Sequence, residues 1–183
     1  AIKNSIDILR RAIPGNIEII TKLEEGVPLI MANSTQIQQV IMNLSINARD
    51  AMPDGGILTI ETAVVGEGNG AVNGIHAEEG GFVNLSVSDT GLGMDEDTKR
   101  KIFDPFFTTK EAGKGTGLGL YTVHLITSNH GGYLNLYSEP NKGTRFSIYL
   151  PITKGVKAEK IPETEDLMGS GTILVIDDDA RIR

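Results

Sequence analysis

The chain has 183 residues, of which 39% are hydrophobic and 22% are charged, and its formal net charge is −7. This composition is ordinary for a globular domain, and the negative charge argues against a broad nucleic-acid-binding surface. The chain contains no cysteine, which excludes disulfides and thiolate metal sites and favours a cytoplasmic location, and no apolar run of about 18 residues predicts a membrane span.

The first third of the chain predicts a helix, a strand and a longer helix. Residues 1–13 form an amphipathic pattern, which we expect to be the remnant helix of a preceding region, with an apolar side made of Ile2, Ile6, Leu9 and Ile13. Residues 16–22 predict a strand. Residues 34–52 predict the strongest helix, because Asn33 is a predicted N-cap with Gln36 three residues later. Its apolar stripe at helical spacing consists of Ile37, Val40, Ile41, Leu44, Ala48, Ala51 and Met52.

Two strands and the connection between them are predicted next. Residues 57–65 predict a strand, and residues 66–81 are a polar, glycine-rich connection. Residues 83–88 alternate between apolar and polar side chains, which predicts a half-buried strand. We expect this strand to pair with residues 57–65 as a hairpin.

The rest of the chain predicts two helices, a second hairpin and a linker. The helices cover residues 95–102 and 118–129, and the hairpin strands cover residues 133–138 and 144–151. Residues 153–171 are charged and poor in core residues, as linkers are. Together these elements predict a mixed or antiparallel sheet with helices on one face.

The strand period carries Asp89 onto the buried face of residues 83–88, and Gly91 and Gly93 follow at once. A buried carboxylate without partners costs several kcal/mol, so Asp89 needs hydrogen-bond donors. One interpretation is a structural aspartate that accepts from turn amides. The other is an acceptor for the amine of a purine, with the glycines letting a flat base approach the backbone. Thr144 favours the second interpretation, because it points inward at the end of another strand.

Asn43 and Asn47 lie four residues apart, so their side chains share one flank of the predicted helix 34–52. Asparagine does not favour helices, and two at this spacing need a reason. They either form a satisfied polar edge or offer neutral oxygen ligands to Mg²⁺ held between phosphates.

A glycine-rich stretch precedes the predicted helix 118–129, with alternating glycines at 113, 115, 117 and 119. It forms neither a P-loop nor a G-x-G-x-x-G pattern. It is either a flexible hinge or a set of backbone amides that bind an anion at a helix start. Lys110 and Lys114 could reach phosphate oxygens as point charges, and the preceding aromatic cluster IFDPFF would anchor a movable lid.

Residues 14–152 closely resemble the catalytic ATP-binding domain of bacterial sensor histidine kinases. This domain belongs to the GHKL superfamily, which gyrase, the mismatch-repair ATPases and a heat-shock chaperone share. The family's motifs occur in order: the asparagine box NLSINARDAM, the first glycine box DTGLGM, the phenylalanine box IFDPFFTTK, the second glycine box GKGTGLGL and the threonine strand GTRFSIYLP. The resemblance implies an α/β two-layer sandwich of the Bergerat type that binds ATP (or ADP) and Mg²⁺.

The resemblance also implies a role for each motif. Asp89 would accept from the adenine amine, with Thr144 supporting it through water. Asn47, together with Asn43, would carry Mg²⁺ and serve catalysis. Residues 103–117 would form a lid over ATP, called the lid below. The other nucleotide-contacting positions implied are Gly91, Gly93, Lys110, Lys114, Gly115, Thr116, Gly117, Leu118 and Gly119.

Two positions bear on the chemistry. ATP-hydrolysing members of the superfamily carry a glutamate where this chain has Asn43, so the resemblance implies slow hydrolysis and favours transfer to a protein nucleophile. Many members carry a lysine where this chain has Asp50. The positive charge toward the phosphates must then come from Arg49, Lys110 or Lys114.

The three histidines at 76, 124 and 130 lack the acidic neighbour that usually follows an acceptor histidine, and His130 is expected on the polar surface at a helix end. The resemblance therefore implies that the partner is an upstream dimerisation region carrying the acceptor histidine, to which residues 1–13 would belong. The isolated chain is expected to bind ATP without phosphorylating itself. A nucleotide-binding module without transfer, or a Ser/Thr kinase of the anti-sigma type, would be the alternatives.

Residues 172–183 resemble the first strand of a response-regulator receiver domain, with Asp177 and Asp178 as its acidic pair. This implies a hybrid kinase with a truncated receiver, so that the second partner is a fused receiver or a separate response regulator. Neither nucleic acid nor direct membrane contact is expected for this stretch, although the parent protein could be membrane-anchored.

Overall fold

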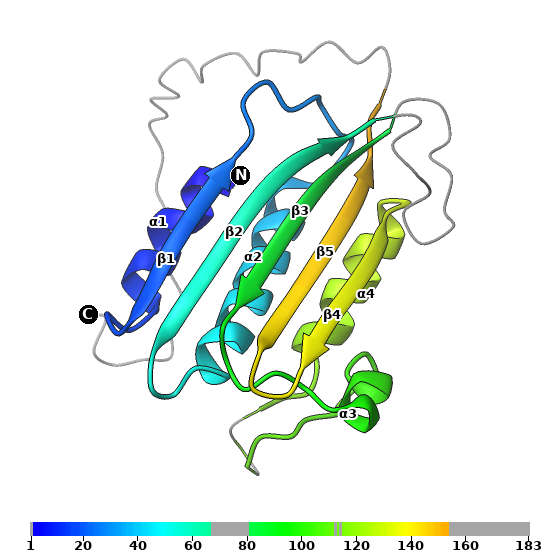
Figure 1. Ribbon diagram of the computed structural model, residues 1–183. Coiled ribbons are helices and arrows are strands. Elements are labelled where there is room, and N and C mark those ends of the chain that lie inside the picture. The colour runs from blue at the N-terminus through cyan, green and yellow to red at the C-terminus, as the bar shows by residue number, and fades with distance from the viewer. Residues whose placement is uncertain (1, 67–80, 112, 114, 154–183) are drawn as a thin grey trace, which may run out of the picture.

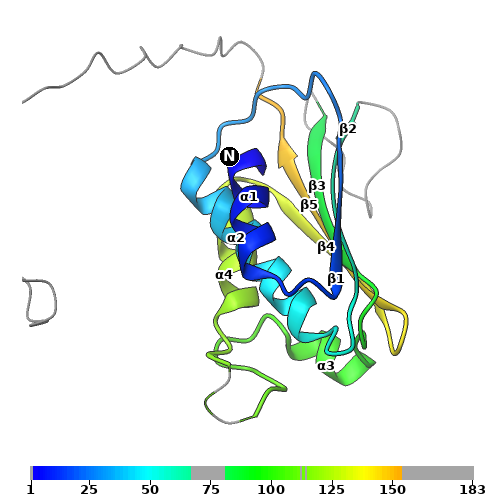
Figure 2. The same ribbon diagram turned by 90° about the vertical axis from the view of Figure 1, so that its left-hand side faces the viewer.

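The computed structural model describes residues 2–66, 81–111, 113 and 115–153. These residues form one sheet with helices on one face (Figure 1, Figure 2). The strands are β1 (Ile17–Leu23), β2 (Gly56–Val65), β3 (Phe82–Asp89), β4 (Tyr133–Glu139) and β5 (Gly143–Pro151). The helices are α1 (Ile2–Ala12), α2 (Ser34–Asp50), α3 (Glu96–Lys101) and α4 (Gly119–Asn129). Several predicted segments lie outside the described residues: the linker after Thr153, the receiver-like strand, Lys114 and nearly all of the glycine-rich connection.

The sheet is mixed, with strand order β1-β2-β3-β5-β4. β1 and β2 are parallel, and α2 connects them as a crossover. The other neighbours are antiparallel, which confirms both predicted hairpins, β2 with β3 and β4 with β5. Figure 2 shows α1, α2 and α4 on the same side of the sheet, so the predicted two-layer sandwich is confirmed. No helix in the described part of the chain combines the length and apolarity that crossing a bilayer requires.

α2 forms the centre of the helical layer. Its predicted cap is confirmed, because the side chain of Asn33 accepts from the backbone amides of Thr35 and Gln36 at 2.9 and 3.2 Å. The backbone amide of Asn33 donates to Nε2 of His130 at 3.2 Å, while Nδ1 of His130 lies 2.8 Å from the carbonyl oxygen of Ile126. His130 is therefore more than helix-end surface: it links the end of α4 to the start of α2.

α1 packs into the same core as α2 and the sheet. Leu9 is completely buried, and Ile6 and Ile13 are each only 8% exposed. Ile8 lies on the outer side of the helix and is 51% exposed. The helix predicted for residues 1–13 is thus a packed part of this domain. Its origin in an upstream dimerisation region stays a prediction.

Replacing Leu9 by alanine should lower the free energy of unfolding by about 2–5 kcal/mol, because the substitution leaves a cavity in the core. Ile8→Ala is the matched control and should cost roughly 1 kcal/mol or less. Urea denaturation of both variants measures the difference. Equal, small effects would show that α1 does not unfold together with the rest of the domain.

Candidate nucleotide site

One cavity of about 580 Å³ lies at the end of the sheet where β3 finishes and β5 begins, beside the last turns of α2 and the first turn of α4. This is the lower end of the molecule in Figure 1. Its lining includes most of the predicted site residues: Asn43, Asn47, Asp89, Gly93, Lys110, Gly115, Thr116, Gly117, Gly119 and Thr144. The structure therefore brings together motifs that lie up to a hundred positions apart in the sequence. Gly91 and Leu118 lie beside the cavity without lining it.

Asp89 and Thr144 face each other across the β3–β5 pair, as partners in the sheet register. Oδ1 of Asp89 accepts from the amide of Gly91 at 2.8 Å. Burial raises the pKa of Asp89 above its ordinary value, and the amides of Gly91 and Thr144 oppose this only in part. The arrangement combines features of both sequence interpretations: turn amides satisfy part of the carboxylate, and its place in the cavity wall leaves acceptor capacity for a ligand.

Thr144 is only 7% exposed, as its inward phase predicts. Its hydroxyl lies 2.9 Å from the hydroxyl of Ser138, which itself donates to the carbonyl of Gly143 at 3.1 Å. Because a hydroxyl has only one proton, Thr144 is the donor to Ser138. The oxygen of Thr144 consequently keeps acceptor capacity on the cavity side.

The two glycines after Asp89 are also required by the protein's own backbone, and their predicted role in admitting a base stays a prediction. A methyl group on Gly91 would collide with the backbone carbonyl of Ala51, and one on Gly93, where φ is 64°, would collide with the carbonyl of Glu139. The amide of Leu92 donates to that same Ala51 carbonyl at 2.9 Å. The glycines thus let the turn pack against the protein's own backbone, which fixes the direction in which Asp89 enters the cavity.

Asn43 and Asn47 lie on one flank of α2, next to the start of α4. Nδ2 of Asn43 donates to the carbonyl oxygen of Gly119 at 3.2 Å, and a methyl group on Gly119 would touch both asparagine side chains at 3.9 Å. Oδ1 of Asn47 accepts from Nζ of Lys110 at 3.3 Å. The side-chain oxygen of Asn47 therefore contacts the ammonium group of Lys110. The side-chain nitrogen of Asn43 is bonded to the Gly119 carbonyl.

This donor set fits Mg²⁺ that a phosphorylated ligand brings with it. Amide oxygens are hard neutral ligands, and Mg²⁺ takes its anionic ligands from phosphates. Among the described residues there is no cluster of three or more histidine, aspartate or glutamate side chains that would hold a metal ion without such a ligand.

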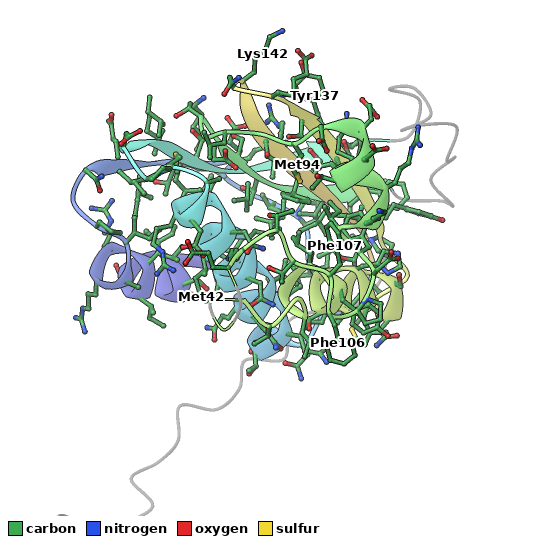
Figure 3. All side chains as sticks on the ribbon, turned by 90° about the horizontal axis from the view of Figure 1, so that it is seen from below. Met42, Met94, Phe106, Phe107, Tyr137 and Lys142 are labelled. Carbon is green, nitrogen blue, oxygen red and sulfur yellow. The ribbon has the colours of Figure 1, made fainter. Side chains whose placement is uncertain are left out.

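The lid is tied at its base and carries its aromatic residues on two sides. Phe103 and Phe107 pack against the core, whereas Phe106 is 73% exposed and has a φ of 68°. Figure 3 shows Phe107 toward the interior and Phe106 on the side of the molecule away from the sheet. The amide of Phe106 donates to the carbonyl oxygen of Gly117 at 3.1 Å. Two of the three aromatics therefore anchor the lid, rather than all three.

Asp50 stands at the position where many members of the superfamily carry a lysine, and it forms ion pairs with Arg49 and Lys110. Its carboxylate accepts from Arg49 at 2.7 and 2.8 Å and from Nζ of Lys110 at 2.5 Å. Burial alone would raise the pKa of Asp50, but the bonds from Lys110 and Arg49 outweigh it and hold the pKa below its usual value. Of the basic residues expected near the phosphates, Arg49 and Lys110 both line the cavity, and Nζ of Lys110 also donates to Oδ1 of Asn47.

The sequence interpretation missed the apolar walls of the cavity. These are formed by Met94, Ile102, Phe107, Leu120 and Phe146. Phe146 is the next inward residue after Thr144 on β5, so strand phase could have identified it. The others come from a turn, the C-cap of α3, the lid and α4, and only the tertiary structure places them together.

The comparisons with known proteins agree with this geometry. A family model described as "Histidine kinase-, DNA gyrase B-, and HSP90-like ATPase" matches residues 32–154. The sensor kinase CckA of Brucella abortus (strain 2308) is 39% identical over 189 residues, which cover 96% of this chain and 20% of that protein. The chain thus spans about a fifth of the length of such curated relatives.

Two solved structures extend the likeness to the fold. The catalytic domain of histidine kinase ThkA, in a nucleotide-free form, superposes with a TM-score of 0.64 at 29% identity, covering 82% of this chain and 90% of that one. Full-length ShkA in complex with AMPPNP gives a TM-score of 0.62 at 25% identity, over 82% of this chain and 30% of that one. The chain belongs to the family of histidine kinase-, DNA gyrase B- and HSP90-like ATPases. Within this family it is homologous to the catalytic domains of sensor histidine kinases.

Asp89→Asn should stabilise the nucleotide-free protein at neutral pH. Because the folded pKa of Asp89 lies above its unfolded value, folding takes up a proton between the two values, so the carboxylate lowers stability as the pH rises through that interval. The variant should be more stable than the wild type at pH 7, and the gap should close as the pH falls below about 4. Thermal melts across this range measure the gap. A gap that does not change with pH would contradict the assignment of the strained charge to Asp89.

Proposed function

We propose that this chain is the ATP-binding catalytic domain of a sensor histidine kinase. In this proposal it transfers the γ-phosphoryl group of Mg·ATP to a histidine on a separate dimerisation region. One observation carries the proposal: a half-buried carboxylate, Asp89, and a pair of asparagine amides, Asn43 and Asn47, line the same cavity. The carboxylate suits the amine of a base, and the pair of asparagine amides suits a phosphate-bound cation.

The base end of the cavity would take adenine. Asp89 accepts from the amides of Gly91 and Thr144, and because a carboxylate has about four acceptor positions it keeps capacity for an exocyclic amine. Thr144, as an acceptor, supports the same edge directly or through a water. The surrounding walls are apolar, with Met94 and Phe146 among them, which suits a flat aromatic ring.

The phosphate end would take the anionic part of the ligand. α4 begins at Gly119, and its N-cap residue, Leu118, makes no side-chain cap hydrogen bond. The Leu118 side chain therefore leaves the first backbone amides of α4 available to an anion. Lys110 brings a positive charge to this end. The side-chain oxygens of Asn43 and Asn47 would hold a Mg²⁺ that arrives with the phosphates, and such an ion would supply positive charge that stabilises the transferring group.

Neither carboxylate in the described cavity lining is available to activate a water molecule, which favours phosphoryl transfer over hydrolysis. These carboxylates are Asp50 and Asp89. Asp89 belongs to the base end, and Asp50 is paired with Arg49 and Lys110, so neither is free to activate a water at the phosphates. Asn43 occupies the position at which hydrolysing members carry a glutamate. A nucleophile supplied by another protein domain is therefore expected to accept the phosphoryl group.

The proposed acceptor is a histidine on a separate dimerisation region, not one of the histidines of this chain. His124 packs against Phe103 with ring centroids 5.5 Å apart, and His130 bonds the amide of Asn33, so both described histidines have structural roles. The partners proposed are thus an upstream helical hairpin with the acceptor histidine, and a response regulator or fused receiver, in the cytoplasm.

Asp89→Asn should weaken the binding of a non-hydrolysable ATP analogue about ten- to a hundredfold, because it replaces a hydrogen bond to a charged group worth about 1.5–3 kcal/mol. Isothermal titration calorimetry measures the affinity. Glu61→Gln is the matched control, since Glu61 is an ion-paired acid that does not line the cavity, and it should leave the affinity unchanged. Unchanged binding by Asp89→Asn would refute the adenine assignment.

The purified helical hairpin of the parent protein, mixed with this chain and γ-labelled ATP, should become labelled on a histidine. Acid-labile label supports the histidine kinase. Acid-stable label would point to a Ser/Thr kinase of the anti-sigma type, and ATP binding without any label would leave a nucleotide-binding module. The Asn47→Ala variant should reduce labelling of the histidine at least a hundredfold, if the Mg²⁺-carrying asparagine is required for transfer.

A further inference from the structure

Lys110 lies across the cavity, from the lid to α2. Its Nζ is 3.3 Å from Oδ1 of Asn47 and 2.5 Å from Oδ2 of Asp50. Asn47 and Asp50 lie about one turn apart near the end of α2. The ammonium group thus occupies the oxygen of the very asparagine that is proposed to carry a phosphate-bound cation.

The local structure of the lid directs Lys110 to this place. The amide of Lys110 donates to the hydroxyl of Thr108 at 3.2 Å, which forms a tight local turn. Gly115 lies against the lysine stem, because a methyl group there would sit 3.2 Å from Cδ of Lys110 and 2.7 Å from the hydroxyl of Thr108. The bond from Phe106 to Gly117 closes the base of the lid behind them. The lysine therefore extends from a loop whose two limbs pack together.

Asp50 is the group that holds the ammonium in this position. The side chains of Lys110 and Asp50 are 32% and 27% exposed, so their ion pair is partly shielded from solvent. Asn47, a neutral amide at the longer distance, holds the ammonium less strongly than the carboxylate does. Removing the charge of Asp50 would thus free the lysine from Asn47 as well.

A divalent cation and this ammonium compete for one oxygen. A divalent cation and an ammonium that shared Oδ1 of Asn47 would lie within a few Å of each other, and their repulsion opposes both the contact of Lys110 with Asn47 and its ion pair with Asp50. Binding of a cation at Asn47 must therefore move Lys110 away. Lys110 belongs to the lid, so the lid loses its charged contact with α2 in the same step.

We propose that Asp50 and Lys110 form a latch that keeps the lid against α2 in the nucleotide-free protein, and that the cation arriving with the nucleotide opens it by displacing Lys110 from Asn47. Asp50 is a positioning residue for Lys110 in this account. The inference rests on the proposed function, because the cation comes with the nucleotide. The freed ammonium is then available to the phosphate oxygens.

A double-mutant cycle on Mg·ADP affinity tests the latch. Asp50→Asn removes a negative charge near the phosphates, which strengthens binding in any account, and in the latch account it also removes the contact that binding must break. Asp50→Asn should therefore raise the affinity for Mg·ADP by a factor that is at least threefold larger in the wild-type background than in the Lys110→Met background. Equal gains in the two backgrounds would overturn the proposal. A smaller gain in the wild-type background would also overturn it, since Asp50 would then be holding Lys110 in its productive place.

Hydrogen exchange of the lid amides without nucleotide gives an independent measurement. Asp50→Asn and Lys110→Met should each raise the exchange rate of described lid residues at least threefold, while Glu61→Gln, the matched loss of an ion-paired acid on the sheet, should not. Unchanged exchange in both latch variants would refute the latch. If the wild-type chain fails to bind Mg·ADP at all, the proposed function fails, and this exchange measurement still decides whether the latch exists.

Discussion

The carboxylate of Asp89 at the rim of the sheet is the group on which the rest of the site depends. It is a charge held where burial disfavours charge, and the backbone amides of Gly91 and Thr144 compensate for that burial only in part. The turn that follows Asp89 packs closely against the Ala51 and Glu139 carbonyls, which leaves its backbone little room to move. The fold thus maintains an acceptor whose remaining capacity only a ligand or water fills, which is the physical basis of preorganised binding.

In the latch proposal, the site divides into a rigid part and a part that moves. Asp89 and Thr144 sit on paired central strands, and Asn43 and Asn47 sit on a helix that α1 and α4 flank on the same face of the sheet. These groups are fixed before any ligand arrives. The charged group, Lys110, belongs instead to the lid, which two phenylalanines and one backbone hydrogen bond hold at its base. Recognition is therefore assigned to the scaffold, and the response to the ligand to the lid.

The sequence predicted the features that local periodicity controls, such as the stripe of α2, its Asn33 cap and both hairpins. It also predicted that Asp89 and Thr144 point inward at strand ends, because strand phase is a local property, whereas their adjacency depends on the pairing of β3 with β5. It could not predict contacts that depend on distant backbone, such as the role of Gly91 against Ala51 or the bond from His130 to Asn33. The pairing of Lys110 with Asp50 was missed for a related reason: sixty residues separate them, and only the path of the lid brings them together.

The most direct test of the account is a crystal structure of the chain with Mg²⁺ and a non-hydrolysable adenine nucleotide. The account predicts the exocyclic amine of adenine within hydrogen-bond distance of the free Asp89 oxygen, and the metal ion coordinated by the side-chain oxygen of Asn47. A base bound elsewhere in the molecule, with Asp89 contacting only protein and water, would contradict it.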